Sequence, residues 1–315
     1  MKIYKIINSS TRAEIIILHF GLGLVGYGFR KQLYFNYELD IEEYNVKFDW
    51  NSNFNVLADQ INDIIAVVRK ISTIKENPLV NVLWSAGKAG FSATKFEANE
   101  ESEFFNKTIN LLVKSLVELK YKIHFCLLSS AGGLHESNDL IVTSSDQIGI
   151  TRNYGYLKKE QEDLLINHSL IKYKTIFRLS SVYTTSNFSG RLGLISVLVK
   201  SGIIGKVVNI NGNENTLRDY VLDLDIGRFI QYYFSQINFS PLSIKYLING
   251  KPSSILEIKN SVEKVINKKI YINYSSNNVN ASNITFSSVL KPKNLKSSLI
   301  TLNIKLLYDN ILEYF

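Results

Sequence analysis

The chain has 315 residues, which is enough for one large domain or two moderate ones around a buried core. Hydrophobic residues make up 45% and charged residues 20%, and no low-complexity tract or solenoid repeat occurs, so the composition is that of a globular protein. The formal net charge is +8, but the basic residues are scattered and form no long block. We therefore expect a solvated basic surface and no nucleic-acid partner.

No targeting segment is expected from the sequence. The first apolar run, residues 15–29, is too short for a membrane span and is interrupted by His19 and four glycines. No small-residue cleavage site follows it, so we predict no signal peptide, no membrane span and a cytoplasmic location. The single cysteine, Cys126, lies in an apolar run and is predicted to be a buried free thiol. The four histidines lack the paired spacing of zinc ligands, which predicts no metal site.

Runs of β-branched residues alternate with amphipathic stretches along the first 180 residues. Leu57, Ile61 and Ile64, for example, share one face of a helix. In chain order the pattern predicts a polar extension over residues 1–12, a strand at 14–20, a helix at 24–35, a strand at 45–49, a helix at 56–75, a strand at 79–84, a helix at 100–120, a strand at 122–128, a helix at 154–169 and a strand at 175–179.

This alternation predicts the fold class. Strands that alternate with helices form βαβ units, so we expect an α/β fold with a doubly wound parallel sheet covered by helices on both faces. After Ser180 the pattern loosens, and Asn, Ser and Gly become more frequent. We therefore place a first domain at residues 1–180 and a smaller region at 181–315, some segments of which return to the sheet.

A glycine-rich turn follows the first predicted strand. Residues 21–26 (GLGLVG) match GxGxxG between a strand and a helix, the setting in which this motif binds a dinucleotide in Rossmann folds. The first glycine allows a tight turn, the second admits a pyrophosphate and the third allows close helix packing. The alternative is a packing turn without a ligand. The predicted NAD(P)-binding residues of this turn are Gly21, Gly23, Leu24, Val25 and Gly26.

An acid at the end of the second strand would accept hydrogen bonds from the adenine ribose and favour NAD. Asp49 is the candidate, and the alternative is a strand-end acid without a ligand. Lys47 and Arg30 offer cations for a 2′-phosphate, so the choice between NAD and NADP stays open.

Tyr154 and Lys158 stand four residues apart and share one face of a predicted helix. The ordinary pKa of tyrosine is near 10, and a neighbouring ammonium favours the phenolate, so Tyr154 becomes able to exchange a proton with a sugar hydroxyl or ketone. The YxxxK pattern alone is common in a chain with 18 tyrosines. Here, however, Ser129 and Ser130 follow a predicted strand at the sheet edge where ligands bind. Ser130 is the favoured partner of Tyr154, and Ser129 is the alternative.

The glycine turn, the serine pair and the Tyr-Lys pair together resemble the extended short-chain dehydrogenase/reductases, in particular the NAD-dependent epimerase/dehydratase family that acts on sugar nucleotides. Residues 84–87 (WSAG) resemble the family's strand end beside the cofactor, which implies cofactor contacts from Ala86 and Gly87. Residues 177–183 resemble its LRxxNVYG stretch and residues 217–221 its RDYVxVxD segment. The resemblance covers about residues 14–230. It implies that Lys158 holds the nicotinamide ribose and that the chain forms a homodimer.

The chain also departs from the family pattern. Phe20 replaces the first glycine of GxxGxxG, Ser181 replaces the asparagine of NVYG, and Thr184 replaces its glycine. No Asp-Glu pair follows Ser130, which argues against dehydration and leaves epimerisation or reduction of a ring carbon, most plausibly C4.

Three residues are candidates for the substrate side. Resemblance implies that Arg218 contacts the diphosphate or its ribose, and Ser181 takes the place of a substrate-binding asparagine. Arg191 lies in a glycine-flanked loop, and an arginine fork suits phosphate. The alternatives are an ion pair of Arg218 with Asp219 or Asp223, and an exposed loop cation for Arg191. Arg178 is predicted to be structural.

The sequence therefore predicts an NAD(P)-dependent sugar-nucleotide epimerase or 4-ketoreductase. The alternative is a non-catalytic NAD(P)-binding Rossmann module that acts as a sensor or partner scaffold, although such modules commonly lose the tyrosine or the lysine.

Overall fold

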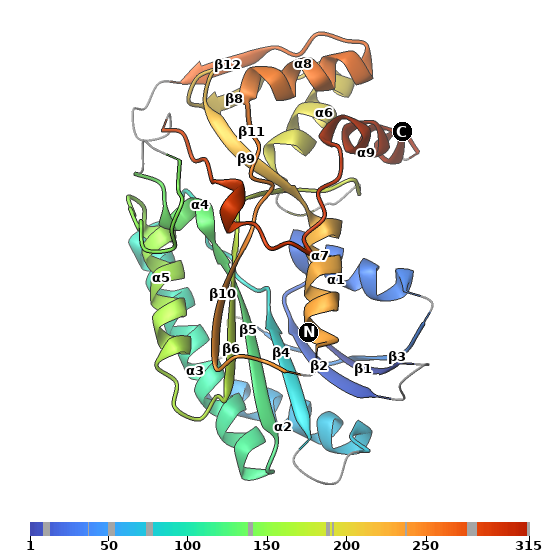
Figure 1. Ribbon diagram of the computed structural model, residues 1–315, viewed down its shortest axis with the longest axis vertical. Helices are drawn as coiled ribbons and strands as arrows, with labels where there is room; N and C mark the ends of the chain where they lie inside the picture. Colours follow the sequence, from blue (N-terminus) through green and yellow to red (C-terminus); the bar gives the residue numbers. More distant parts are fainter. Residues whose placement is uncertain are drawn as a thin grey trace.

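The computed structural model describes residues 1–8, 13–36, 38–49, 54–73, 78–137, 141–186, 190, 192–236, 238–275 and 282–313. A seven-stranded sheet with the order β10-β6-β5-β4-β2-β1-β3 forms its centre (Figure 1). Its strands are β1 (Lys2–Asn8), β2 (Glu14–Phe20), β3 (Leu39–Asn45), β4 (Leu79–Trp84), β5 (Lys122–Ser130), β6 (Tyr173–Leu179) and β10 (Leu242–Leu247). From β2 to β10 all neighbours pair in parallel, which confirms the predicted α/β fold class.

Helices cover both faces of the sheet (Figure 1). Side chains alternate along a strand, so Ile16 and Leu18 of β2 pack on one face and Ile17 on the other. The first face carries α2 (Phe54–Ile71), α3 (Lys95–Glu118) and α5 (Asn153–Ile166), and the second carries α1 (Leu24–Phe35) and α7 (Asp223–Phe234). Because both faces of the sheet are buried, the sequences of these strands are continuous apolar runs. Cys126 on β5 is a buried free thiol, as predicted, and burial raises its pKa.

The start of α3 illustrates how local chemistry sets a boundary. Thr94 caps the helix: its hydroxyl accepts from the backbone N–H of Glu97 at 3.2 Å, and the Glu97 carboxylate accepts from the backbone N–H of Thr94 at 2.8 Å. This reciprocal capping box starts the helix at Lys95, earlier than the predicted residue 100.

The N-terminal residues form a strand. β1 pairs antiparallel with both β2 and β3, so it is inserted between them. Its buried side chains are those of Ile3, Tyr4 and Ile6. The predicted polar extension over residues 1–12 is therefore wrong. Lys2 and Lys5 interrupt the apolar residues and hide their pattern, and both lysines form ion pairs with glutamates of the neighbouring strands.

The predicted strand at 45–49 is also wrong. β3 ends at Asn45, and residues 46–49 are irregular. Charged residues on the exposed side of β3 obscure its apolar positions in the sequence. Because β1 separates β3 from β2, Asp49 does not end a strand that adjoins the glycine turn. The segment nevertheless returns towards β2, since the ring centroids of Phe48 and Phe20 lie 5.0 Å apart.

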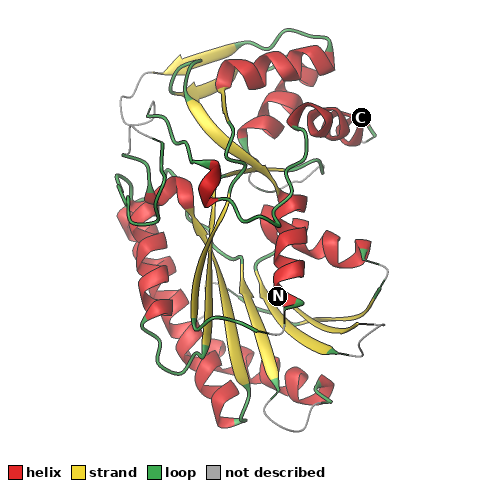
Figure 2. Cartoon of the chain, viewed as in Figure 1, coloured by secondary structure: helices red, strands yellow, loops and turns green. Residues whose placement is uncertain are grey.

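The later part of the chain forms a smaller region beyond the carboxyl ends of the parallel strands, where helices and short strands gather (Figure 2). Its strands are β7 (Ser181–Tyr183), β8 (Val208–Asn211), β9 (Leu217–Leu222), β11 (Pro252–Ser254) and β12 (Ile272–Ser275). Its helices are α6 (Leu194–Ile204), α8 (Ile255–Ile266), the 3-10 helix η2 (Ser288–Leu290) and α9 (Ile300–Leu312). In this part of the chain, β10 joins the main sheet and α7 packs on α1.

Candidate active site

The candidate residues gather at the carboxyl edge of the main sheet. The turn after β2 carries Gly21, the turn after β4 carries Ala86 and Gly87, and β5 ends at Ser130. Ser181 follows β6 and begins β7. Ligands of open parallel α/β sheets bind in the crevice at this edge.

The glycine turn has three distinct environments. Gly21 has a φ of +87°, and a Cβ there would lie 2.5 Å from the Ala86 Cα atom, so only glycine fits. A Cβ at Gly26 would lie 2.2 Å from the Gly21 carbonyl oxygen, so this glycine lets α1 pack against the turn. Gly23, at the N-cap of α1, has no atom within 4 Å of its Cβ position. These environments match the three glycine roles in GxGxxG.

The turn has the open space and the unpaired N–H groups that binding of a pyrophosphate requires. The open side at Gly23 faces the start of α1, where the first backbone N–H groups, including those of Leu24 and Val25, have no partner within the helix. The first turn of α1 contains no acidic residue, so nothing there offsets the partial positive charge of the helix N-terminus.

His19 and Ser85 fix the shape of this turn. The Ser85 hydroxyl donates to the carbonyl oxygens of Phe20, at 2.9 Å, and of Gly21. His19 Nε2 lies 2.9 Å from the same hydroxyl oxygen, within hydrogen-bond distance. Burial lowers the pKa of His19 to about 3, so its ring is neutral and has a structural role.

Three residues are considered for the adenosine half of the cofactor: Asp49, Lys47 and Arg30. Asp49 is exposed in the segment that Phe48 holds against β2, and Lys47 is exposed beside it. Arg30 donates to both carboxylate oxygens of Glu43, at 2.8 and 3.2 Å. Burial raises the pKa of Glu43, but hydrogen bonds from Arg30 and other donors outweigh it and bring the pKa to about 2. Arg30 is thus held by Glu43.

α5 brings Tyr154 and Lys158 to the same edge. The Lys158 ammonium lies 5.7 Å from the centre of the Tyr154 ring. Lys158 is buried, donates to Gln161 Oε1 at 2.9 Å and lies 3.6 Å from Glu101 Oε1 on α3. These two partners fix the ammonium beside the phenol. The sequence analysis missed both. Glu101 lies on α3, and no local pattern relates α3 to α5, whereas Gln161 follows Lys158 by three residues on the same helix, a spacing that helix geometry could have revealed.

Ser130 is the serine that faces Tyr154. Its hydroxyl accepts from the backbone N–H of Gly133, at 3.0 Å, and caps the short helix α4 (Ala131–Leu134). A Cβ at Gly133 would lie 3.3 Å from Ser130 Oγ and 3.0 Å from Tyr154 Cδ1, so the serine hydroxyl and the tyrosine ring flank the same glycine. Ser129 is buried and points to the other side of β5, because side chains alternate along a strand. The geometry favours Ser130.

Two contacts hold α5 in place. A Cβ at Gly155 would lie 2.3 Å from the Gly133 carbonyl oxygen, so the helix approaches α4 through a glycine. Arg178 on β6 donates to both carboxylate oxygens of Glu162 on α5, at 3.0 and 2.7 Å. Both side chains of this ion pair are buried. Arg178 therefore has the structural role predicted for it.

One small cavity is lined by Ser130, and a second shares Phe91 and Arg218 with it. The first, of about 60 Å³, is lined by Phe91, Ser130, Gly132, Ser180, Ser181, Arg218, Asp219, Ile284 and Phe286. The second, of about 150 Å³, is lined by Phe91, Glu136, Arg152, Asn211 and Arg218. Ser181 and Arg218 thus line the same cavity as Ser130, whereas Arg191 lies outside the described residues. Among the described residues, no three His, Cys, Asp or Glu side chains gather as a metal site.

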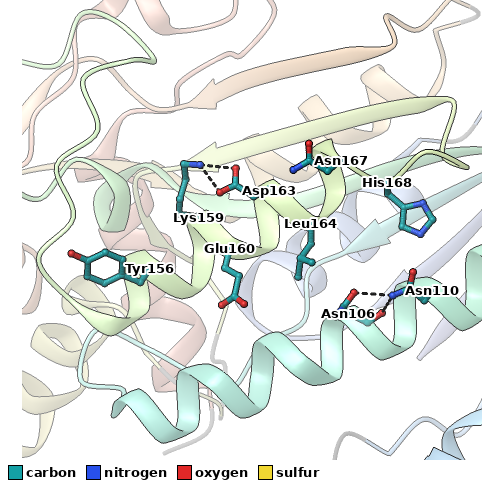
Figure 3. Close-up of a pocket in the computed structure, with 9 residues that line it drawn as sticks. All are labelled: Asn106, Asn110, Tyr156, Lys159, Glu160, Asp163, Leu164, Asn167 and His168. Carbon is teal, nitrogen blue, oxygen red and sulfur yellow. Dashed lines mark hydrogen bonds and ion pairs between the residues drawn. The ribbon is translucent and has the colours of Figure 1, made fainter.

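A larger groove of about 610 Å³ lies on the outer surface, between α3 and α5 (Figure 3). Tyr156, Lys159 and Asp163 line it from α5. These residues lie on the opposite side of the helix from Tyr154 and Lys158 at 3.6 residues per turn, so the groove is separate from the candidate active site.

The sequence matches no protein-family model and no curated protein. Solved structures do share its fold. MoeE5, solved with UDP-glucose and NAD, matches with a TM-score of 0.72 at 15% identity, over 95% of this chain and 98% of MoeE5. UDP-glucose 4-epimerase from Thermotoga maritima, solved with UDP-glucose, matches with a TM-score of 0.70 at 16% identity, over 95% and 98% of the two chains. RMD from Pseudomonas aeruginosa, complexed with NADPH, matches with a TM-score of 0.71 at 12% identity, over 95% and 99%.

At these identities the similarity establishes the fold. Each match spans almost the whole of both chains, the smaller region included. The chain therefore has the fold of MoeE5, RMD and the UDP-glucose 4-epimerases, and the fold that the sequence resemblance implied is confirmed. Within the described residues, no helix is long and apolar enough to cross a membrane.

Proposed function

We propose that this protein is an NAD(P)-dependent enzyme that epimerises or reduces a ring carbon, most plausibly C4, of a sugar nucleotide. The observation that carries the proposal is the meeting of Tyr154, Lys158 and Ser130 at the sheet edge that also bears a glycine turn fitted to a dinucleotide. The solved structures of the same fold contain UDP-glucose, NAD or NADPH, which supports the same classes of ligand for this chain.

Several residues would hold the cofactor. The turn at 21–26 would hold the pyrophosphate, Ala86 and Gly87 would border it, and Lys158 would bind the nicotinamide ribose. Asp49 would bind the adenine ribose of NAD. Bound NAD or NADP would supply hydride exchange with the sugar carbon, chemistry that protein side chains do not provide.

The chain itself handles the proton. Tyr154 takes a proton from the reacting hydroxyl when the sugar is oxidised and returns it when the ketone is reduced. The Lys158 ammonium provides a positive charge 5.7 Å from the centre of the Tyr154 ring, and Ser130 donates a hydrogen bond to the reacting oxygen. Arg218 and Ser181 bind the substrate beside them, and Arg191 remains a prediction for the same side.

The first experiment is to denature the purified protein and identify any nucleotide that it releases. Near-stoichiometric NAD⁺ or NADH supports an epimerase, which regenerates its cofactor. A protein that releases nothing but binds NADH or NADPH reversibly supports a one-way ketone reductase. A protein that binds none of these nucleotides contradicts the function of the glycine turn and the catalytic proposal with it.

The non-catalytic module is the alternative function. Such a module would bind NAD(P) without turning over any sugar nucleotide, and replacement of Tyr154 would leave its behaviour unchanged. The homodimer and the cytoplasmic location also remain predictions. Light scattering on the purified protein measures the mass and tests the homodimer.

A further inference from the structure

Two loops of the smaller region carry exposed residues that the proposed function does not use. The first leads from the end of α6 into β8 over residues 203–207 (IIGKV), and the second leads from α8 into β12 over residues 267–271 (NKKIY). We call these two segments the loop pair. α8 and β12 lie at the end of the molecule opposite α2 (Figure 1), so the loop pair is separate from the candidate active site.

Each loop is a helix end that turns directly into a strand. α6 ends at Gly205, with a φ of +72°, and α8 ends at Asn267, with a φ of +53°. A left-handed residue at this position stops a helix and turns the chain out of it, and glycine and asparagine adopt this conformation most readily. The residues that follow each cap are therefore held in short turns at the surface.

Hydrogen bonds place the two loops side by side. The Val208 N–H group donates to the Tyr271 carbonyl oxygen at 2.9 Å, which continues the parallel pairing of β8 and β12. The Lys268 ammonium donates to the Ile203 carbonyl oxygen at 3.1 Å. A cation at the end of α6 also interacts favourably with the negative end of the helix dipole. The loop pair is thus one surface made from two segments far apart in the sequence.

Apolar side chains project from this surface. Val208 pairs with Ile272, and both side chains belong to the core of the smaller region. Because side chains alternate along a strand, the preceding residues, Val207 and Tyr271, point outward together. They are 51% and 68% exposed, and Ile204 on the first loop is 58% exposed. Exposed apolar residues are normally scattered singly, whereas these three lie on adjacent loops.

The charged residues of the loop pair are all basic. Lys206, Lys268 and Lys269 are exposed, and neither segment contains an acidic residue. The Lys269 ammonium lies 3.3 Å from Glu263 on α8, but the same carboxylate lies 3.2 Å from the Lys259 ammonium. Lys259 therefore balances Glu263, and the loop pair keeps a positive charge.

An anionic lipid bilayer is the partner that matches this surface. Lysines are attracted to its negative head groups, a tyrosine ring is stable at the level of the head groups, and aliphatic side chains are stable where the acyl chains begin. A protein partner matches less well, because a stable interface buries about 800 Å² on each side and the loop pair consists of two short turns.

We propose that the loop pair is a peripheral membrane-binding surface that holds this protein on anionic bilayers. The lysines bring the loop pair to the lipid head groups, and Ile204, Val207 and Tyr271 enter the interface. This binding goes beyond the proposed function and does not depend on it.

The test is sedimentation of the purified full chain with vesicles of phosphatidylcholine alone or of phosphatidylcholine mixed with phosphatidylglycerol. We expect binding to the mixed vesicles that weakens as salt is added, because salt screens the charges. Replacing Lys206 and Lys269 together by Gln lowers this binding about 25-fold, at about fivefold for each lysine near an anionic surface. Tyr271→Ser lowers it as well, because an interfacial ring is lost.

The matched control replaces Lys107 and Lys114 by Gln. It removes the same charge from exposed lysines of α3 and keeps the vesicle binding of the wild type. A wild type that sediments with neither vesicle overturns the proposal. An equal loss in the control also overturns it, because net charge alone then explains the binding. Light scattering adds a third outcome: a dimer mass that Tyr271→Ser halves shows that a second copy covers the loop pair, which likewise overturns the proposal.

Discussion

At the residue scale, the Lys158 ammonium lies between a phenol and a carboxylate, with Tyr154 on one side and Glu101 on the other. Gln161 completes this arrangement with a hydrogen bond to the ammonium. A lysine held so closely acts as a fixed charge rather than as a mobile surface side chain. The proposed proton exchange therefore depends on the hydroxyl group of Tyr154, beside which this charge is fixed.

We expect Tyr154→Phe to lower kcat/KM by about 10²–10⁴-fold, because the ring stays and only the proton-exchanging hydroxyl is lost. NAD(P) affinity stays within a few-fold of the wild type. Tyr156→Phe is the matched control on the outward side of the same helix (Figure 3), and it keeps full activity. Turnover of a sugar nucleotide by Tyr154→Phe at a rate near that of the wild type would rule out its acid–base role.

Asp223 provides a pH prediction. It is buried at the start of α7, and burial raises its pKa to about 7 from an ordinary 3.8. The folded protein therefore holds this proton more tightly than the unfolded chain. The stability contributed by Asp223 is present below about pH 4 and is lost as the pH rises through about 7.

Asp223→Asn removes this titration and keeps an oxygen acceptor for the Leu224 N–H group. We expect the variant to gain stability relative to the wild type as the pH rises. The difference in the free energy of unfolding, variant minus wild type, is larger at pH 8 than at pH 5 by about 2 kcal/mol, at 1.36 kcal/mol per pKa unit. Urea denaturation at the two pH values measures this difference. An equal effect of the substitution at both pH values contradicts the prediction.

At the element scale, glycines control how closely helices approach their neighbours. Gly26 brings α1 against the turn after β2, and Gly155 brings α5 against α4. Gly28 of α1 and Gly227 of α7 meet each other, so α1 is held on two sides. Gly23 differs from all of these because open space surrounds it. Glycines of the same segment thus serve packing at some positions and ligand access at another.

The substitutions Gly26→Ala and Gly23→Ala separate these two roles. The first places a methyl group against backbone, and we expect it to destabilise the fold by about 1–3 kcal/mol. The second adds a methyl group to open space at a φ of −67°, so the change in stability is below about 1 kcal/mol, while NAD(P) affinity falls about tenfold or more. Thermal melts and cofactor titrations measure the two effects. A Gly23→Ala protein with wild-type affinity would show that no pyrophosphate approaches this turn.

At the scale of the whole molecule, the sheet and its helices combine the first residues of the chain with segments beyond residue 220. β1 comes from the first eight residues, and β10 joins the sheet beyond β6 (Figure 1). α7 covers the face that α1 leaves open, with Phe229, Ile230 and Phe234 in the shared core. The candidate site likewise combines strand ends of the sheet with Arg218 of the smaller region.

We therefore expect a fragment of residues 1–180 not to fold cooperatively. It lacks α7 and β10, so one face of its sheet and the edge of β6 are exposed. Circular dichroism during thermal denaturation distinguishes a sharp transition of the full chain from a gradual loss of signal in the fragment. A sharp transition for the fragment would show that residues 1–180 fold as an independent unit.

The sequence by itself determined the features that a short window of residues encodes. Apolar periodicity predicted most strands and helices of the first half, and the glycine turn and the Tyr154–Lys158 spacing predicted where ligand-binding groups gather. These patterns are local, because the backbone geometry of a turn or of one helix face involves only neighbours in the chain.

Only the tertiary structure decided which distant segments meet. Strand pairing inserted β1 beside β2 and displaced the strand expected to end at Asp49. The packing of α3 against α5 brought Glu101 to Lys158, and the packing of the smaller region brought Arg218 to the cavity that Arg152 lines. Such contacts join residues far apart in the sequence, and their free energy depends on the whole arrangement of the sheet, so no local pattern contains them.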